Sequence, residues 1–218
     1  MAHSKQLISQ VPAPQLYLVT PQVGDAAVFA RELAVALDAA DIAAVLLRLA
    51  EADERSQINI VKALAPLVQG KGVALLLDGH ADIVAHGGAD GGHLTGIEEF
   101  LAALDTLKPA RIAGCGGLAT RHDAMTAAER GADYVMFGDA ADGRRPSFDA
   151  IVERVAWWAE VFAVPCVALA ASLDEVGPLA AAGADFVALG EFIWADPRGV
   201  AAALASAAKQ ITAPETVA

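Results

Sequence analysis

The phrase Gly-Ala-Asp occurs three times in this chain, at residues 88–90, 131–133 and 183–185. The second and third copies follow alanine-rich stretches and run directly into short apolar segments that end in glycine. The glycine of each phrase suits the end of a helix, where a positive φ is needed, and the apolar segment suits a buried strand. A recurring helix-to-strand unit predicts parallel strands with crossover helices, because tight hairpins cannot join parallel neighbours.

Eight strand-like runs alternate with stretches whose apolar residues recur at helical spacing. Eight such units in roughly 200 residues predict an α/β fold, a single compact (β/α)8 TIM barrel. An open, doubly wound sheet is the alternative, because periodicity alone does not show whether a sheet closes. The expected strands are residues 16–20, 43–49, 73–78, 91–95, 111–116, 133–138, 166–171 and 186–190.

Composition favours one domain with a large core. The chain has 218 residues, of which 56% are apolar and 19% charged, which suits a parallel sheet covered on both sides. We expect a barrel domain over residues 15–212, preceded by a polar leader, residues 1–14, and followed by a tail, residues 213–218. Cys115 and Cys166 fall within expected strands and suit buried, reduced thiols, from which we expect a cytoplasmic protein.

The net charge of −12 argues against nucleic acid and against an anionic membrane as partners. A small phosphorylated substrate is compatible with this charge, because it needs only a local group of donors. The sequence contains no run that approaches the roughly 18 apolar residues of a membrane span. Trp157 and Trp158 share an expected helix, where they favour core packing or a subunit contact, so a homodimer is one expectation.

Chemistry in a barrel of this kind lies at the carboxyl ends of the strands, which form a rim. The aspartates of the Gly-Ala-Asp phrases lie at the opposite ends, so we expect them to be structural. No lysine is expected at the rim, where the cations are arginines. Arg48 ends an otherwise apolar strand, and a charge there is costly unless it reaches solvent or a ligand. Arg144 and Arg145 follow the sixth strand, where they could clamp a phosphate or form a solvated pair.

Carboxylates and histidines also fall at this rim. Asp78 ends the third strand and could bind a divalent cation or cap the next helix. His93, late in the fourth strand, could be catalytic at the mouth or a core histidine. Glu98, just beyond, could pair with Asp78 or favour the first turn of a helix. With His80 these residues could also form a transition-metal site, although their spacing is not specific for one.

Two glycines, Gly116 and Gly117, end the fifth strand. Glycine at this place lets backbone N–H groups approach a ligand closely. A plain tight turn needs glycine too, so a binding role and a structural role both stay open.

At these residues the chain resembles the thiamine phosphate synthase family, which shares its barrel with the related thiazole tautomerases. The resemblance covers residues 15–194. It implies a TIM barrel and a transferase of thiamine biosynthesis that joins a hydroxymethylpyrimidine pyrophosphate to a thiazole phosphate with the help of Mg²⁺. The segments that carry it are LYLVTP at 16–21, VLLR at 45–48, GVALLLD at 72–78, ADGGHL at 89–94, GADYV at 131–135 and AGADFV at 182–187.

Applied to this sequence, the resemblance implies that Arg48 binds the diphosphate and that Asp78 and Glu98 bind the magnesium ion. Ser172, with neighbouring N–H groups, would hold the thiazole phosphate. We group the candidate residues by expected role: catalytic, Arg48 and His93; substrate-binding, Arg48, Gly116, Gly117, Arg144, Arg145, Ser172 and Gly190; metal-binding, Asp78 and Glu98.

The chain also departs from the family pattern. Leu46 and Ala50 replace a glutamine and a lysine that flank Arg48 in the family, and Gly79 replaces a magnesium-binding aspartate. Glu191 stands where the family has a small-residue phosphate turn. Two alternatives therefore stay open: a barrel that binds a phosphorylated metabolite or a partner protein without synthase chemistry, and a tautomerase or isomerase. The tautomerases' catalytic histidine follows the fifth strand, where this chain has glycines and His122 lies further along.

Overall fold

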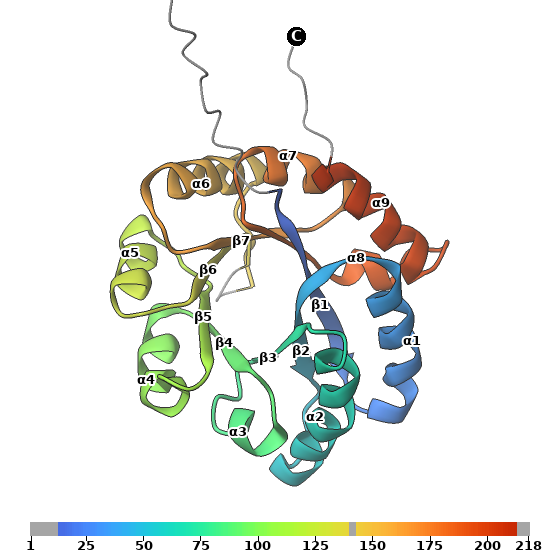
Figure 1. Ribbon diagram of the computed structural model, residues 1–218. Helices are drawn as coiled ribbons and strands as arrows, with labels where there is room; N and C mark the ends of the chain where they lie inside the picture. Colours follow the sequence, from blue (N-terminus) through green and yellow to red (C-terminus); the bar gives the residue numbers. More distant parts are fainter. Residues whose placement is uncertain (1–12, 140–142, 213–218) are drawn as a thin grey trace, which may run out of the picture.

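The computed structural model of the protein, which describes residues 13–139 and 143–212, is a closed barrel of eight parallel strands (Figure 1). All eight expected strands are present, and most of their ends agree with the sequence to within one residue. The expected barrel domain, residues 15–212, starts with the first strand and stops with the last helix, whereas most of the leader and the whole tail lie outside the described residues. The strands are β1 (Gln15–Val23), β2 (Ile42–Leu49), β3 (Ala74–Asp78), β4 (Gly91–Thr95), β5 (Ile112–Gly116), β6 (Tyr134–Phe137), β7 (Cys166–Ala170) and β8 (Phe186–Leu189).

Helices form a ring around the strands, as Figure 1 shows. Among the described residues, none of these helices is both long and apolar enough to cross a membrane. They are α1 (Ala26–Ala39), α2 (Glu54–Gln69), α3 (Val84–Gly87), α4 (Ile97–Leu107), α5 (Arg121–Glu129), α6 (Phe148–Val161), α7 (Val176–Ala181), α8 (Glu191–Trp194) and α9 (Val200–Thr212), with a short 3-10 helix, η1 (Leu173–Glu175), before α7.

The sheet closes into a barrel, because β1 pairs with β8 as well as with β2. The alternative of an open, doubly wound sheet was therefore wrong. The strand order runs from β1 to β8 in sequence, so every carboxyl end lies at the same rim.

The first strand ends three residues later than expected. The sequence predicts an end at Thr20. In the structure the register between β1 and β2 shifts between Val19 and Gln22, which is the signature of a β-bulge, and β1 continues to Val23. The bulge brings Gln22 to the rim beside Arg48.

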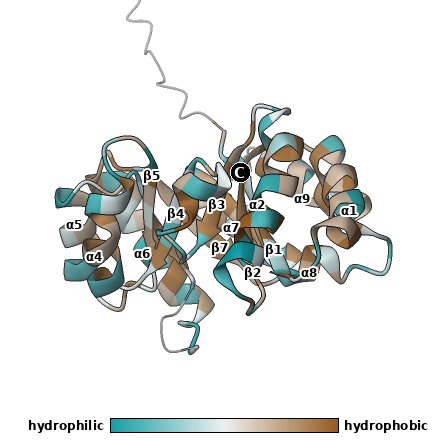
Figure 2. Cartoon of the chain, turned by 90° about the horizontal axis from the view of Figure 1, so that it is seen from below, coloured by the Kyte–Doolittle hydropathy of each residue, from teal (hydrophilic) through white to brown (hydrophobic). Residues whose placement is uncertain are grey.

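The core has two layers. Apolar side chains between strands and helices form the larger one, and Figure 2 shows the strands as apolar segments enclosed by helices of mixed polarity. A smaller cluster fills the barrel interior with residues from six of the strands, among them Tyr17, Leu46 and Tyr134. Layered side chains of this kind make a barrel a packed core rather than a pore.

Trp158 belongs to the larger layer. It is fully buried, stacks on Phe162 at 4.1 Å between ring centroids, and donates its indole N–H to Val164 O at 2.7 Å. Trp157 is half-buried beside it, with the Arg121 guanidinium 4.6 Å from its ring centroid. Both rings therefore pack within the chain.

Both cysteines are buried and unpaired. Burial raises the pKa of each thiol to about 12, so Cys115 and Cys166 are protonated at neutral pH. This agrees with the expected buried, reduced thiols.

The Gly-Ala-Asp phrases have the expected helix-ending geometry. Gly88, Gly131 and Gly183 have φ angles of 82°, 98° and 95°, in the left-handed region that favours glycine. The aspartates lie at the amino ends of the strands, away from the rim, where each forms two hydrogen bonds to a single residue of the preceding strand. Asp90 N–H donates to Leu75 O at 2.8 Å, and Leu75 N–H donates to Asp90 Oδ2 at 2.8 Å. The same pair of hydrogen bonds, which we call an aspartate clamp, joins Asp133 to Ala113 and Asp185 to Cys166.

We expect Asp90→Ala to destabilise the protein by about 1–3 kcal/mol, because the N–H of Leu75 loses a charged acceptor and the strand end loses a clamp. Asp90 also accepts a hydrogen bond from the Gln69 side chain, which adds to the loss. Asp90→Asn keeps an acceptor oxygen and should recover most of this stability. Urea unfolding of the variants measures the effect, with Asp105→Ala on the exposed face of α4 as a near-neutral control.

Candidate functional site

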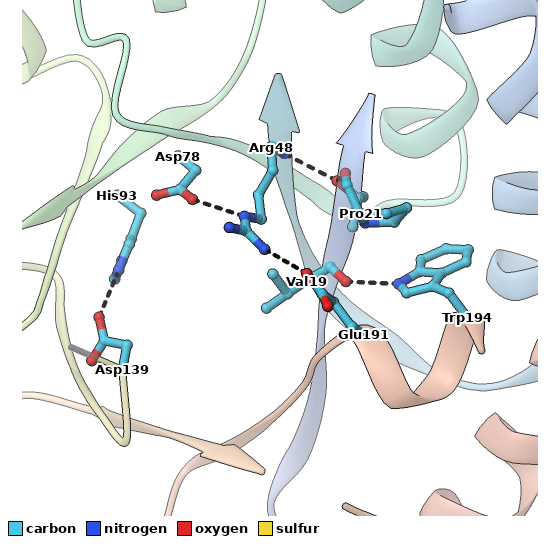
Figure 3. Close-up of polar contacts among 9 residues, drawn as sticks. Val19, Pro21, Arg48, Asp78, His93, Asp139, Glu191 and Trp194 are labelled. Atoms are coloured by element: carbon cyan, nitrogen blue, oxygen red, sulfur yellow. Dashed lines mark hydrogen bonds and ion pairs between the residues drawn. The ribbon is translucent and has the colours of Figure 1, made fainter. Parts of the chain in front are cut away.

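Arg48 is positioned by the bulge in β1. Its backbone N–H donates to the hydroxyl of Thr20 at 3.0 Å, and that hydroxyl donates to Pro21 O at 2.8 Å. Thr20 is completely buried, so its side chain supplies the acceptor at the irregular point of the ladder. Figure 3 shows the result: the Arg48 side chain extends from the end of β2 across the mouth of the barrel.

Two carboxylates contact the Arg48 guanidinium. Asp78 Oδ2, from the end of β3, lies 3.3 Å from Nε, and Glu191 Oε1, from the start of α8, lies 3.3 Å from Nη1 (Figure 3). The side chains of Arg48 and Asp78 are 34% and 31% exposed, whereas that of Glu191 is 78% exposed. Arg48 thus reaches solvent, as the sequence led us to expect, but it carries counter-ions of the chain's own.

A cavity of about 270 Å³ opens beside this group. Its walls come from the carboxyl ends of β1 to β4 and from the first turn of α4, so it lies where barrel enzymes keep their chemistry. The residues that line it are Gln22, Arg48, Leu49, Asp78, Gly79, Thr95 and Glu99.

The structure brings Asp78 to the cavity, but the expected partner Glu98, in the first turn of α4, is not among the residues that line it. The next residue, Glu99, lines the cavity instead. Sequence reasoning missed this residue because two adjacent glutamates differ only in helix phase, about 100° of rotation. Among the described residues, no three His, Cys, Asp or Glu side chains gather closely enough to hold a metal, so the four-residue transition-metal site was wrong.

His93 lies in a buried hydrogen-bond network. Its Nδ1 is 2.9 Å from the hydroxyl of Tyr134, which is 2.9 Å from the hydroxyl of Tyr17. On the other side, His93 Nε2 lies 3.6 Å from Asp139 Oδ2 (Figure 3). Burial raises the pKa of both tyrosines far above the ordinary value of a phenol, so their hydroxyls stay protonated. His93 is 2% exposed and has the surroundings of a core histidine, and its catalytic role stays a prediction.

Gly116 and Gly117 adjoin this network. A Cβ on Gly116 would lie 2.1 Å from Asp139 Oδ2 and 2.6 Å from His93 Nε2, so the close approach of these groups requires glycine. The N–H of Gly117 donates to Asp139 Oδ2 at 2.7 Å. In this structure Gly116 leaves room for the contact between Asp139 and His93, and Gly117 donates a hydrogen bond to Asp139. A role of the two glycines in ligand binding stays a prediction.

Arg145 forms a second ion pair at the rim. Its Nη2 is 2.6 Å from Glu175 Oε2 and its Nη1 is 3.1 Å from Glu175 Oε1, a bidentate arrangement, while Nη2 also donates to Leu169 O. Glu175 Oε2 accepts in addition from Ala171 N–H at 2.8 Å, just beyond β7. No sequence pattern links these partners, which are 30 residues apart.

The other expected substrate-binding residues lie at the same end of the barrel. Ser172 precedes η1 and is half-buried, and Gly190 precedes α8. Arg144 is exposed in the loop before α6. The described structure therefore places the expected residues in two groups, one around Arg48 and Asp78 and one at the ends of β6, β7 and β8. The groups meet where Glu191, the neighbour of Gly190, contacts Arg48.

A second cavity, of about 350 Å³, lies at the amino ends of the strands, and its walls include Ala43, Ala74 and Phe186. Its lining is mainly apolar and holds a single charged residue, Asp133, which takes part in a strand clamp. The rim cavity is therefore the candidate active site.

Comparison with known proteins identifies the relatives of this barrel. The family described as thiamine monophosphate synthase matches residues 16–193. A thiamine-phosphate synthase of Rhodospirillum centenum is 41% identical over 196 residues, which cover 88% of this chain and 94% of that protein. A thiamine-phosphate synthase of Hyphomonas neptunium is 34% identical over 203 residues, which cover 88% of this chain and 91% of that protein. Among solved structures, a thiamine phosphate pyrophosphorylase from Pyrococcus furiosus superimposes with a TM-score of 0.73 at 22% identity, over 90% of this chain and 95% of that chain.

Proposed function

This chain belongs to the thiamine monophosphate synthase family, and from that premise we propose that it is a magnesium-dependent transferase that joins a hydroxymethylpyrimidine pyrophosphate to a thiazole phosphate. The reaction releases pyrophosphate. The observation that carries the proposal is the group at the rim, in which the Arg48 guanidinium shares one cavity with the carboxylates of Asp78 and Glu99.

The donor end of the site is the part around Arg48. As the bond to the diphosphate breaks, negative charge collects on the leaving group, and a cation already in place lowers the barrier. Arg48 suits this role because a guanidinium donates several hydrogen bonds in one plane to phosphate oxygens. A fully buried threonine holds its backbone, so the strand end that carries the guanidinium is fixed before substrate binds.

The residues of the cavity fit a magnesium ion. Mg²⁺ prefers hard oxygen ligands and is commonly held by one or two carboxylates together with water and substrate phosphates. Asp78 and Glu99 supply two carboxylates, and Thr95 and Gln22 add a hydroxyl and an amide oxygen on the same walls. When bound, the ion would neutralise charge on the departing pyrophosphate. We propose Asp78 and Glu99 as its ligands, with Glu98 outside the cavity.

We place the acceptor end at the carboxyl ends of β7 and β8, where many TIM barrels hold phosphate. Ser172 and Gly190 support this placement because both lie in the loops that follow these strands. Arg145 adds a cation nearby, although its guanidinium is paired with the carboxylate of Glu175. A cytoplasmic location is supported by the two buried, unpaired cysteines.

A second candidate function is binding of a phosphorylated metabolite without synthase chemistry. One observation favours it: Leu46, Ala50 and Gly79 stand where the family has a glutamine, a lysine and a magnesium-binding aspartate, so part of the synthase machinery is absent from these positions.

The two candidates are separated by one assay. Purified protein is incubated with both substrates and Mg²⁺, and pyrophosphate release is measured against reactions that lack the thiazole phosphate or contain a chelator of divalent cations. We expect release that needs both substrates and stops with the chelator. Release no greater than in the reaction without acceptor would remove the synthase proposal. Thermal stabilisation by a phosphorylated metabolite would then support the binding function, because a ligand of the native state raises its stability.

A further inference from the structure

Glu191 contacts the cation that we assign to the diphosphate, and the proposed reaction has no use for a carboxylate there. We propose that Glu191 is a resident counter-ion of Arg48 that the incoming diphosphate displaces, and that it makes the rim select the complex of diphosphate with a divalent cation over the free anion. This inference rests on the proposed function, because it concerns the same substrate group.

The backbone of Glu191 is held in place from the far side of α8. The indole N–H of Trp194 donates to Val19 O at 2.8 Å (Figure 3), and the Trp194 ring packs against Phe29 at 5.1 Å between ring centroids. Ile193 is fully buried. Since α8 is a single turn, Glu191 cannot move away from the mouth unless these contacts break.

The side chain of Glu191, in contrast, is free to leave. It is 78% exposed, and its contact with Arg48 is one charged hydrogen bond of 3.3 Å. Exposed ion pairs of this kind contribute little to stability, so the carboxylate can exchange for a stronger ligand of Arg48 at small cost. A diphosphate is such a ligand, because it brings more charge and more acceptor oxygens to the guanidinium.

The charge around Arg48 explains the selectivity. One guanidinium shares the mouth with three carboxylates: Asp78 and Glu99 on the cavity walls, and Glu191 beside it. A free diphosphate anion therefore meets net negative charge. A divalent cation held by Asp78 and Glu99 reverses this balance and leaves Glu191 as the remaining competitor for Arg48.

The test measures binding of inorganic pyrophosphate by calorimetry, with Mg²⁺ and with a chelator, so it needs no turnover. For Glu191→Gln we expect metal-free binding at least about tenfold tighter than in the unaltered protein, and a smaller gain with Mg²⁺, where the cation already offsets the repulsion. Glu191→Asp keeps the charge but is one methylene shorter, and should resemble the unaltered protein in its metal requirement.

Glu153→Gln is the matched control. Glu153 pairs with Arg121 at 2.8 Å through a 75% exposed side chain on α6, and its substitution changes the net charge equally. Metal-free binding that is equal in Glu191→Gln and in Glu153→Gln would overturn the inference, as would metal-free binding by the unaltered protein as tight as with Mg²⁺. If no variant binds pyrophosphate under either condition, this inference is overturned too. The assay of both substrates decides the proposed function separately, because release of pyrophosphate does not depend on this result.

Discussion

Replacing Arg48 with alanine should slow pyrophosphate release by roughly 100-fold or more. Loss of one preorganised charge-stabilising group commonly costs two to three orders of magnitude in rate. Arg48 is the cation that lines the rim cavity, so we expect no neighbouring side chain to take over. The measurement is kcat for pyrophosphate release with both substrates saturating, together with the KM for the diphosphate.

Arg55→Ala is the control for this experiment. Arg55 is exposed in the first turn of α2, beyond the same strand, and does not line the cavity, yet its loss changes the net charge by the same amount. We expect less than a threefold change in kcat for Arg55→Ala, in keeping with a surface charge screened by salt. An unchanged kcat in Arg48→Ala would contradict the role that we give to Arg48.

Replacing Gly91 with alanine should destabilise the barrel by about 3 kcal/mol, near the upper end of what overpacking costs. A Cβ on Gly91 would lie 2.2 Å from Ile112 O and 2.6 Å from Ile112 Cβ on the neighbouring strand β5. Backbone atoms of a paired strand cannot move aside as a flexible side chain can. The strands must therefore separate, and the hydrogen bonds between β4 and β5 weaken. Urea unfolding gives the free energy directly.

The adjacent Gly92 provides the control in the same strand. A Cβ at Gly92 would meet its nearest atom, Leu107 Cδ1, at 3.4 Å, which is an ordinary contact. Gly92→Ala should therefore change stability by less than about 1 kcal/mol. If both alanine variants unfold at the same urea concentration, the close approach of β4 and β5 at Gly91 is not what limits the side chain there.

The barrel could be predicted from sequence because its signals are local. Strands buried on both faces read as unbroken apolar runs, and the Gly-Ala-Asp phrases mark where helices end and strands begin. The count of eight units favoured a closed sheet, which pairing of β1 with β8 confirms. The predicted end of β1 at Thr20 was wrong, because the buried hydroxyl of Thr20 accepts a hydrogen bond from the Arg48 N–H and lets the strand continue through a bulge.

The site was less predictable because it depends on side-chain direction and on distant partners. Arg48 and Asp78 were found from their places at strand ends. Glu99 was missed because helix phase is not visible in two adjacent glutamates. Asp139 and Glu175 were missed because each meets its partner only through the fold. Asp139 meets His93 across β5, and Glu175, beyond β7, meets Arg145 in the loop that follows the neighbouring strand β6.

The three aspartate clamps lie at the end of the barrel opposite Arg48. Energetic effects of substitutions at sites that share no partners are usually additive, so changes at the mouth leave the clamps at full strength. Each clamp holds two neighbouring strands together at their amino ends, whatever residues stand at the carboxyl ends. We therefore expect substitutions in the loops at the mouth to leave the shape of the barrel unchanged.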